Sequence, residues 1–354
     1  EGIYPQQDFY FKVDPFTYEN IDHYTNEDMN LEGEFIAGNI LEPTRQYLTI
    51  QDNNSLGFNM TVPDEGIGVY RNRGILYENL TMSNRGLIGG GSLKRITSTT
   101  VSEEFKFFPD SMITQASAFS IEEDGSGRFP SVNSEDVAVK WLTENDEWYA
   151  SNAQGKYFDM FGNGTMLDGQ LTLTPSVLRG TGIINTSDSR ITSDLFSFAS
   201  SQIKADTSDY NLKSSSTSGY AFIAENVNTD INFDQQMTRF RLNTDTSMVK
   251  FPEIQYICTM TDFTYDMGKK VLSMEQTGKK DMELLPSDKL LELSFADLDK
   301  PTFFSTNVNN DTIAFTSYKG SYYLNDEYVE AENINYIHIA DALIQPEKGK
   351  IVIN

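Results

Sequence analysis

The sequence is poor in cysteine and histidine. Of its 354 residues one is a cysteine, Cys258, and two are histidines, His23 and His338. A single cysteine excludes an intrachain disulfide framework, so it does not fix the redox compartment. Two histidines exclude a three-histidine zinc site, and a Ser-His-Asp triad would have to use one of them.

Long apolar runs and basic residues are also scarce. No apolar run is long enough to cross a bilayer, so we expect no membrane-spanning segment. Lys and Arg number 27 against 52 Asp and Glu, a formal net charge of -25. Nucleic-acid binding needs a cationic footprint, so no nucleic-acid partner is expected, and anionic membrane surfaces are disfavoured. An acidic surface keeps a protein soluble and can hold Ca²⁺.

Aromatic and other apolar residues are plentiful, and they mostly alternate with polar ones. This period of two predicts an all-β protein with at most one short helix. The helix candidate is PSDKLLELSFADLDKP, residues 286–301, in which Ser287 would cap a helix that Pro301 ends. Alternation of Leu291, Leu293 and Phe295 fits a strand equally well.

An internal similarity spaced by 91 residues organises the chain. Residues 80–107 align without a gap with residues 171–198, so that two glycines and two phenylalanines recur: Gly89 and Gly180, Gly91 and Gly182, Phe105 and Phe196, Phe107 and Phe198. At the same offset Asn72 falls on Asn163. A shorter echo, AENVN at 224–228, returns as AENIN at 331–335 and more weakly as SEDVA at 134–138.

The glycine stretch RGLIGGGSLKR, residues 85–95, admits two interpretations. A phosphate-binding loop needs backbone donors, a following lysine and a helix. In the second copy Asn185 and Thr186 replace Lys94 and Arg95, and β-type alternation follows both copies. The pattern therefore favours a strand in which glycine permits a bulge or close backbone approach.

No Pro-rich or Gly/Ser-rich linker divides the chain. We expect an N-terminal β segment (1–60), two β repeat units (61–160 and 161–280) and a C-terminal β segment (281–354), forming one elongated structure built by repetition. Short strands joined by polar turns fit a β-solenoid, a β-groove or serial β-sandwiches, and the sequence leaves all three open.

Several segments carry a family resemblance. With FFPDSM (107–112), SSQIKADTSDYNLKS (200–214) and NYIHIADALIQPEKGKIVI (335–353), the chain resembles a segment of very large, poorly characterised β-repeat envelope or secreted proteins of Gram-negative bacteria. FTYDMGKKVLSM (263–274) is similar to strand pairs of OstA-type β-groove proteins of lipopolysaccharide transport. The first resemblance implies export to the periplasm, outer membrane or cell surface. The second implies a V-shaped sheet with an apolar trough, and neither transfers a catalytic residue.

The first residues, EGIYPQQDFYFKVDPF, contain no initiator Met and no basic signal region, and the chain closes on KIVIN, which reads like an interrupted strand. We therefore expect a processed chain or a segment of a longer protein.

Three clusters are candidates for chemistry. Glu122, Glu123 and Asp124 adjoin a glycine turn and are the candidate Ca²⁺ ligands, with a plain surface turn as the alternative. Asp262 and Asp266 are paired carboxylates of the kind that hydrolyse glycosides, although acidic residues at hairpin ends are ordinary. The third cluster surrounds the turn TENDE and would either stack sugars or pack in the core: Trp141, Trp148 and Tyr149.

These features together predict a non-enzymatic structural or binding component of the bacterial envelope or cell surface. Its partners would be other envelope or surface proteins, or a glycan or apolar ligand, with no cofactor other than Ca²⁺. The alternative is a carbohydrate-active or glycan-binding β protein. An enzyme requires a cleft in which carboxylates and aromatics converge, whereas a scaffold requires only small pockets.

Overall fold

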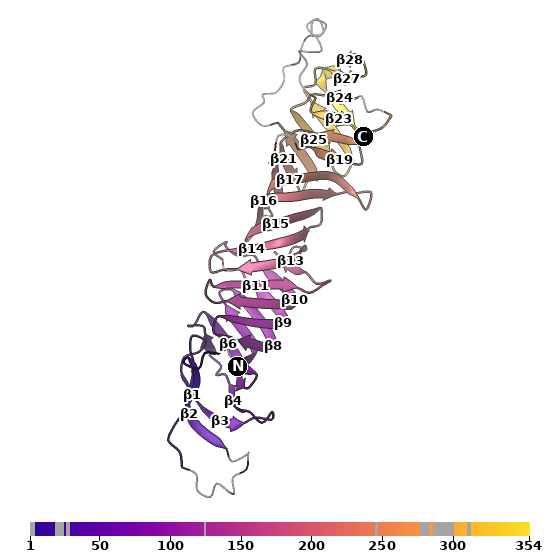
Figure 1. Ribbon diagram of the computed structural model, residues 1–354. Helices are drawn as coiled ribbons and strands as arrows, with labels where there is room; N and C mark the ends of the chain where they lie inside the picture. The colour runs from indigo at the N-terminus through magenta and orange to yellow at the C-terminus, as the bar shows by residue number, and fades with distance from the viewer. Residues whose placement is uncertain are drawn as a thin grey trace. The chain divides into compact units, whose positions relative to one another are not determined.

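The computed structural model describes residues 4–17, 25, 29–123, 125–244, 247–276, 284, 286, 301–309 and 313–354. Within them the chain forms 29 β-strands and one 3-10 turn, η4 (Glu347–Gly349), which confirms the all-β prediction (Figure 1). The helix considered for 287–300 lies outside the described residues. The chain divides into two compact units, Glu1–Arg179 and Gly180–Asn354.

Unit 1 is built from antiparallel pairs of consecutive or nearly consecutive strands. They pair in the order β1–β2–β3–β4–β6–β7–β8–β9–β10, with β5 on β6, and β10 and β13 each pair with both β11 and β12. The strands are β1 (Phe9–Val13), β2 (Asn30–Ala37), β3 (Thr44–Ile50), β4 (Leu56–Thr61), β5 (Ile67–Val69), β6 (Gly74–Ser83), β7 (Gly86–Arg95), β8 (Ser98–Phe107), β9 (Ser111–Ile121), β10 (Val132–Leu142), β11 (Glu147–Asn152), β12 (Phe158–Met160) and β13 (Thr165–Leu173).

Unit 2 continues with antiparallel pairs and then branches. After β15–β16–β17, one branch runs β18–β21–β22–β25–β26–β29 and the other β19–β20–β23–β24–β27–β28. The strands are β14 (Leu178–Asn185), β15 (Ser189–Ala199), β16 (Gln202–Lys213), β17 (Tyr220–Asn232), β18 (Met237–Leu242), β19 (Val249–Phe251), β20 (Tyr256–Cys258), β21 (Asp262–Asp266), β22 (Val271–Glu275), β23 (Phe303–Ser305), β24 (Ala314–Phe315), β25 (Lys319–Tyr323), β26 (Tyr328–Glu332), β27 (Ile337–Ile339), β28 (Ala342–Ile344) and β29 (Ile351–Ile353).

Strand boundaries recur at the 91-residue spacing found in the sequence. Shifted by 91, β8 spans 189–198 and β9 spans 202–212, which match β15 and β16 to within one residue. The short strand β12 shifts onto the bounds of β19. The expectation that residues 80–107 and 171–198 both form strands is therefore confirmed.

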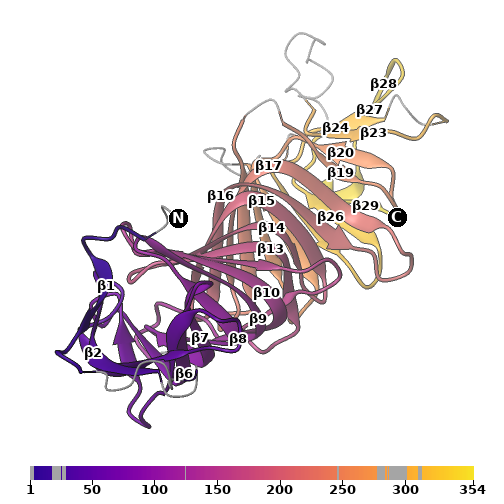
Figure 2. The ribbon, with the colours of Figure 1, turned by 60° about the horizontal axis from the view of Figure 1, so that its bottom comes forward.

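The long strands bend, and each half pairs with a different neighbour. In β10, Val132 and Asn133 pair with β12, whereas Val137 to Leu142 pair with β11. The bend lies at Asp136, which has a φ of 53°, and in β17 the equivalent bend lies at Asn226, with a φ of 55°. Asp and Asn tolerate this left-handed conformation better than other side chains do. Bent strands such as β15 to β17 are visible in Figure 2.

These bends explain the short motif that recurs in the sequence. SEDVA, AENVN and AENIN place Asp136, Asn226 and Asn333 at the same position, and all three have a positive φ, that of Asn333 being 57°. The next residue is buried in each case: Val137, Val227 or Ile334. The motif is thus a structural corner.

In unit 2 the two branches of strands pack face to face. Phe222 of β17 lies 5.4 Å from Phe240 of β18 and 5.5 Å from Phe263 of β21, between ring centroids. Phe251 of β19 lies 5.4 Å from Tyr322 of β25. Rings from one branch therefore fill the space against the other.

The phenylalanines that recur at the 91-residue spacing are core residues. Phe105, Phe107 and Phe196 are fully buried, and Phe198 is 4% exposed. Within each pair the ring centroids lie 6.4 Å and 6.0 Å apart. Burial of such rings is a major source of stabilisation.

The glycine stretch is the strand β7, which rules out a loop at a helix N-terminus. The pairing register with β8 shifts between Gly89 and Gly91, as expected for a bulge. Gly91 has a φ of 102° and Gly182 a φ of 126°, conformations that disfavour a β-carbon. Arg95, at the end of this strand, is buried.

Candidate functional site

The candidate site is a cleft that opens where an antiparallel ladder is interrupted. Strands β8 and β9 pair at Val101 and Ala118 and again at Lys106 and Ile113, with no paired residues between. In unit 2, β15 and β16 show the same interruption, between the pairs Thr192–Asp209 and Ser197–Lys204. Each of these four positions in unit 2 lies 91 residues after its counterpart in unit 1.

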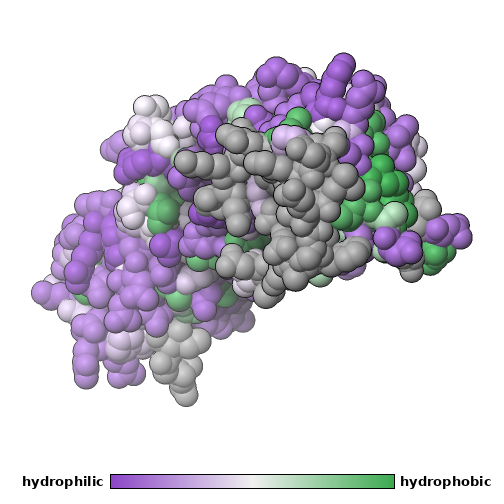
Figure 3. All heavy atoms as spheres, turned by 90° about the horizontal axis from the view of Figure 1, so that it is seen from above, coloured by the Kyte–Doolittle hydropathy of each residue, from purple (hydrophilic) through white to green (hydrophobic). Residues whose placement is uncertain are grey.

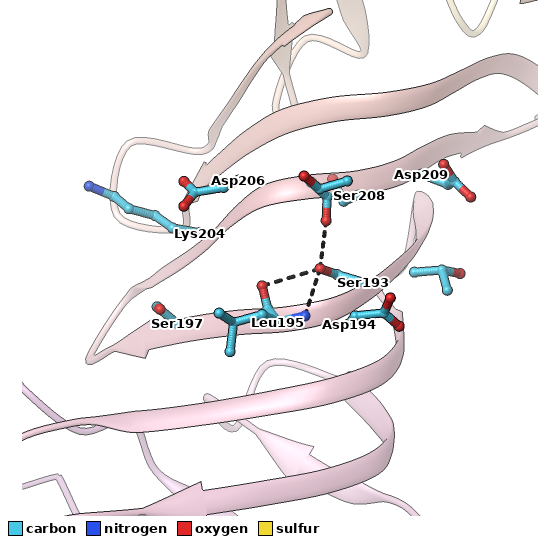
Figure 4. A pocket seen from close by; sticks show the side chains of 10 residues that line it. Ser193, Asp194, Leu195, Ser197, Lys204, Asp206, Ser208 and Asp209 are labelled. Carbon is cyan, nitrogen blue, oxygen red and sulfur yellow. Dashed lines mark hydrogen bonds between the residues drawn. The ribbon is translucent and has the colours of Figure 1, made fainter. Parts of the chain in front are cut away.

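A buried serine replaces the missing backbone pairing at each interruption. The Ser102 hydroxyl donates to the carbonyl oxygen of Gln115 at 2.8 Å and accepts from the backbone N–H of Glu104 at 3.2 Å. Ser193 does the same towards Thr207, at 2.7 Å, and Leu195, at 3.1 Å (Figure 4). Buried backbone groups need such partners, so the opening is part of the folded structure.

The two clefts have volumes of about 650 Å³ in unit 1 and about 390 Å³ in unit 2. Eight of the ten residues that line the second cleft lie 91 positions after a residue that lines the first. The first cleft is lined by Ser102, Glu103, Glu104, Lys106, Ile113, Thr114, Gln115, Ala116, Ser117, Asp136, Ala138 and Val139. The second is lined by Thr192, Ser193, Asp194, Leu195, Ser197, Lys204, Asp206, Thr207, Ser208 and Asp209.

Most of the ionic groups in these clefts already have partners. Glu104 pairs with Arg85 at 2.7 Å, and Asp206 accepts from the Asn228 amide at 3.3 Å. Lys204 lies 3.6 Å from Asp230. These contacts hold carboxylate oxygens at the surface, where they can accept hydrogen bonds from a ligand's hydroxyl groups.

The lining residues are mostly hydroxyl-bearing, acidic and amide side chains, with one lysine in each cleft. Neither cleft is lined by a histidine or a cysteine. The serines at the interruptions donate to backbone carbonyls, so no adjacent base activates them as nucleophiles. The clefts therefore offer recognition through hydroxyls, carboxylates and one lysine each.

Glu122 and Glu123, two of the candidate Ca²⁺ ligands, are exposed residues after β9, and Asp124 lies outside the described residues. Within the described part of the chain, no group of three or more His, Cys, Asp or Glu side chains is arranged to hold a metal ion. Ca²⁺ binding at this turn stays a prediction.

Asp262 and Asp266 occupy the two ends of β21 and are each held by a cation. Asp262 lies 3.3 Å from Arg241 in an ion pair. The Lys269 ammonium, 2.8 Å away, donates to Asp266 and lowers the pKa of its carboxyl. These contacts support the structural interpretation of both acids.

The two tryptophans are core residues, so they do not form an exposed sugar platform. Trp141 and Trp148 face each other across the β10–β11 hairpin, and both are fully buried. The guanidinium of Arg95 lies over both rings, 5.3 Å and 5.8 Å from their centroids. Asp146 pairs with Arg95 at 2.7 Å and accepts from the Trp141 indole N–H at 3.0 Å. Sequence reasoning missed this buried cation.

The largest upward pKa shifts among acidic groups belong to the interior of the units. Burial raises the pKa of Tyr210 to about 12 and that of the Cys258 thiol to about 12. Burial also raises the pKa of Tyr70 and Tyr265. None of these residues lines either repeated cleft.

Comparison of the chain with protein-family models, with curated proteins and with solved structures gives no match. Among the described residues, no helix has the length and apolar content that crossing a bilayer requires. Where described residues are visible in Figure 3, hydrophilic side chains dominate the surface and apolar ones form smaller areas between them.

Proposed function

We propose that this protein is a non-enzymatic, repeat-built β scaffold of the bacterial envelope or cell surface. The observation that carries the proposal is the interrupted ladder with its cleft, which recurs after 91 residues around a tightly packed interior. A catalytic site needs to be built only once, whereas a recurring surface cleft suits repeated recognition of one kind of partner.

The packed interior favours a scaffold over a carrier of apolar ligands. Leu80, Leu87 and Phe107 of unit 1 are fully buried, as are Phe222 and Phe251 of unit 2. An apolar trough would have to leave such side chains accessible to the ligand. A protein that carries an apolar ligand along a β-groove is therefore less well supported than a scaffold.

A second candidate function is glycan binding at the recurring clefts. Ser117, Gln115 and Glu103 in unit 1, and Thr207 and Asp206 in unit 2, supply the hydroxyl, amide and carboxylate groups that hydrogen-bond sugar hydroxyls. Volumes of 390 to 650 Å³ lie in the range of small-ligand sites.

Cell fractionation and a substrate panel test the scaffold proposal. Antibody detection in the source cells should place the protein in the envelope fraction, and protease added to intact cells or spheroplasts should cleave it. The purified protein should release no reducing sugar from a panel of envelope polysaccharides. A cytosolic location would refute the envelope assignment. Sugar release that Asp194→Asn and Asp206→Asn abolish would refute the non-enzymatic one.

A further inference from the structure

A different cleft, of about 610 Å³, lies in unit 1 where four turns meet. Asn39 follows β2, the pair Arg71 and Arg73 lies between β5 and β6, Asp110 lies between β8 and β9, and Thr143 and Glu144 begin the turn after β10. Two guanidinium groups thus line one cleft of a chain whose net charge is -25.

The turn between β5 and β6, which carries Arg71, has a backbone conformation that is unfavourable for residues other than glycine. Tyr70, Arg71 and Asn72 have consecutive positive φ values of 49°, 60° and 61°. At the 91-residue spacing, Phe161 and Gly162 repeat the first two conformations, with φ values of 65° and 60°. Because glycine adopts this conformation without steric cost, the turn itself does not account for an arginine at position 71.

Both guanidinium groups are held in place with donors left over. Arg73 donates from Nε to the carbonyl oxygen of Tyr70 at 3.1 Å and from Nη1 to that of Thr143 at 2.6 Å. Arg71 donates from Nη2 to Oδ1 of Asn39 at 2.8 Å. In the described part of the chain, no carboxylate lies within ion-pair distance of Arg71, whereas Arg73 Nη1 lies 3.9 Å from Asp146, which itself pairs with Arg95. The cleft is therefore preorganised for an anionic group.

Two carboxylates in the same cleft disfavour a small inorganic anion as the ligand and favour one that also carries hydroxyl groups. Asp110 and Glu144 would repel a small inorganic anion that filled the cleft, but they accept hydrogen bonds from hydroxyl groups. A ligand with one carboxylate and several hydroxyls satisfies both sets of groups. A sugar acid has this composition.

We propose that this cleft binds a uronic-acid residue of an acidic polysaccharide. Its carboxylate would pair with Arg71 and Arg73, and its ring hydroxyls would donate to Asp110 and Glu144. Arginine suits this task because its planar fork matches a carboxylate. The inference goes beyond the scaffold proposal and does not depend on the two recurring clefts.

Calorimetric titration tests the proposal with three probes at 150 mM salt, where the Debye length is about 8 Å. The probes are trigalacturonate, the neutral trisaccharide with reduced carboxyls, and inorganic phosphate. We expect trigalacturonate to bind at least about tenfold more tightly than either control probe, because only it carries both kinds of group. Equal binding of phosphate or of the neutral sugar, or no binding of trigalacturonate, would overturn the proposal.

Variants separate binding from folding. Arg71→Gly should weaken trigalacturonate binding at least about tenfold while the melting temperature stays the same or rises, because glycine suits the turn. Arg71→Gln should weaken binding similarly, and Arg45→Gln should not, because Arg45 is an exposed arginine of the same unit that pairs with Asp14 and Glu32 away from the cleft. A lower melting temperature in Arg71→Gly would show that Arg71 serves the fold and would refute the argument from strain.

Discussion

Substituting the strand glycines with alanine separates two physical costs that the structure assigns to different positions. Gly89 has no positive φ, but an added β-carbon would lie 2.7 Å from Leu76 Cδ2 and 2.9 Å from Phe107 Cε2. Gly155 has a φ of 78° and no heavy atom within 4 Å of an added β-carbon. Gly91 combines both features, since its φ is 102° and its β-carbon would lie 2.6 Å from that of Glu78.

The expected magnitudes follow from those contacts. Gly89→Ala forces two fully buried side chains apart, which costs about 1–3 kcal/mol as overpacking does. Gly155→Ala pays for the positive φ alone, on the order of 1 kcal/mol. Gly91→Ala combines strain and crowding, so it should destabilise more than Gly155→Ala does.

The free energy of unfolding of each variant is measured by urea unfolding monitored by circular dichroism. If the two units unfold separately, the first transition is compared between variants. Leu76→Ala combined with Gly89→Ala should destabilise less than the sum of the single variants, because the larger void accepts the new methyl. Unchanged stability in Gly89→Ala would refute the crowding argument. Stabilisation of the parent protein by nucleotide, lost in Gly91→Ala, would restore the phosphate-loop interpretation.

Three further outcomes are expected. Phe196→Ala should cost about 3–5 kcal/mol by calorimetry, whereas Leu195→Ala, at a side chain that is 55% exposed, should change stability by less than about 0.5 kcal/mol. An unfolded tyrosine ionises near pH 10 while buried Tyr210 ionises near 12, so its stabilising contribution is complete below pH 10 and falls as the pH rises towards 12. The melting temperature should therefore drop between pH 10 and 12, and less steeply in Tyr210→Phe. Asp146→Ala leaves the Arg95 guanidinium buried and unpaired and should cost about 3 kcal/mol in urea unfolding, and a loss below 1 kcal/mol would contradict the pair's structural role.

Local patterns were sufficient to predict the all-β class and the strand that contains the glycine stretch. Phe105 and Phe107, and their counterparts Phe196 and Phe198, alternate with polar residues, and the structure buries all four. The loss of Lys94 and Arg95 in the second copy correctly favoured a strand for the glycine stretch. Each of these inferences depends on neighbours along the chain, and a period of two specifies which side chains share a face of a strand.

The clefts were not predicted, although signals for them were present. Ser102 and Ser193 recur at the 91-residue offset, but a serine in a strand is uninformative until the interrupted ladder is seen. Asn72 aligns with Asn163, and the arginines beside Asn72 align with Gly162 and Gly164 beside Asn163. That replacement of glycine by arginine was the visible sign of the second kind of cleft.

The sequence by itself determined that this chain is all-β, that its glycine stretch is a strand, and that its strands carry apolar side chains on one face. Only the tertiary structure decided where long strands bend, where ladders open into clefts, and that Arg95 lies between two tryptophans with Asp146 as its partner. The physical reason is distance along the chain. Strand formation is governed by residues one or two positions apart, whereas Arg95 meets a partner 51 residues away and the arginine cleft gathers four separate turns.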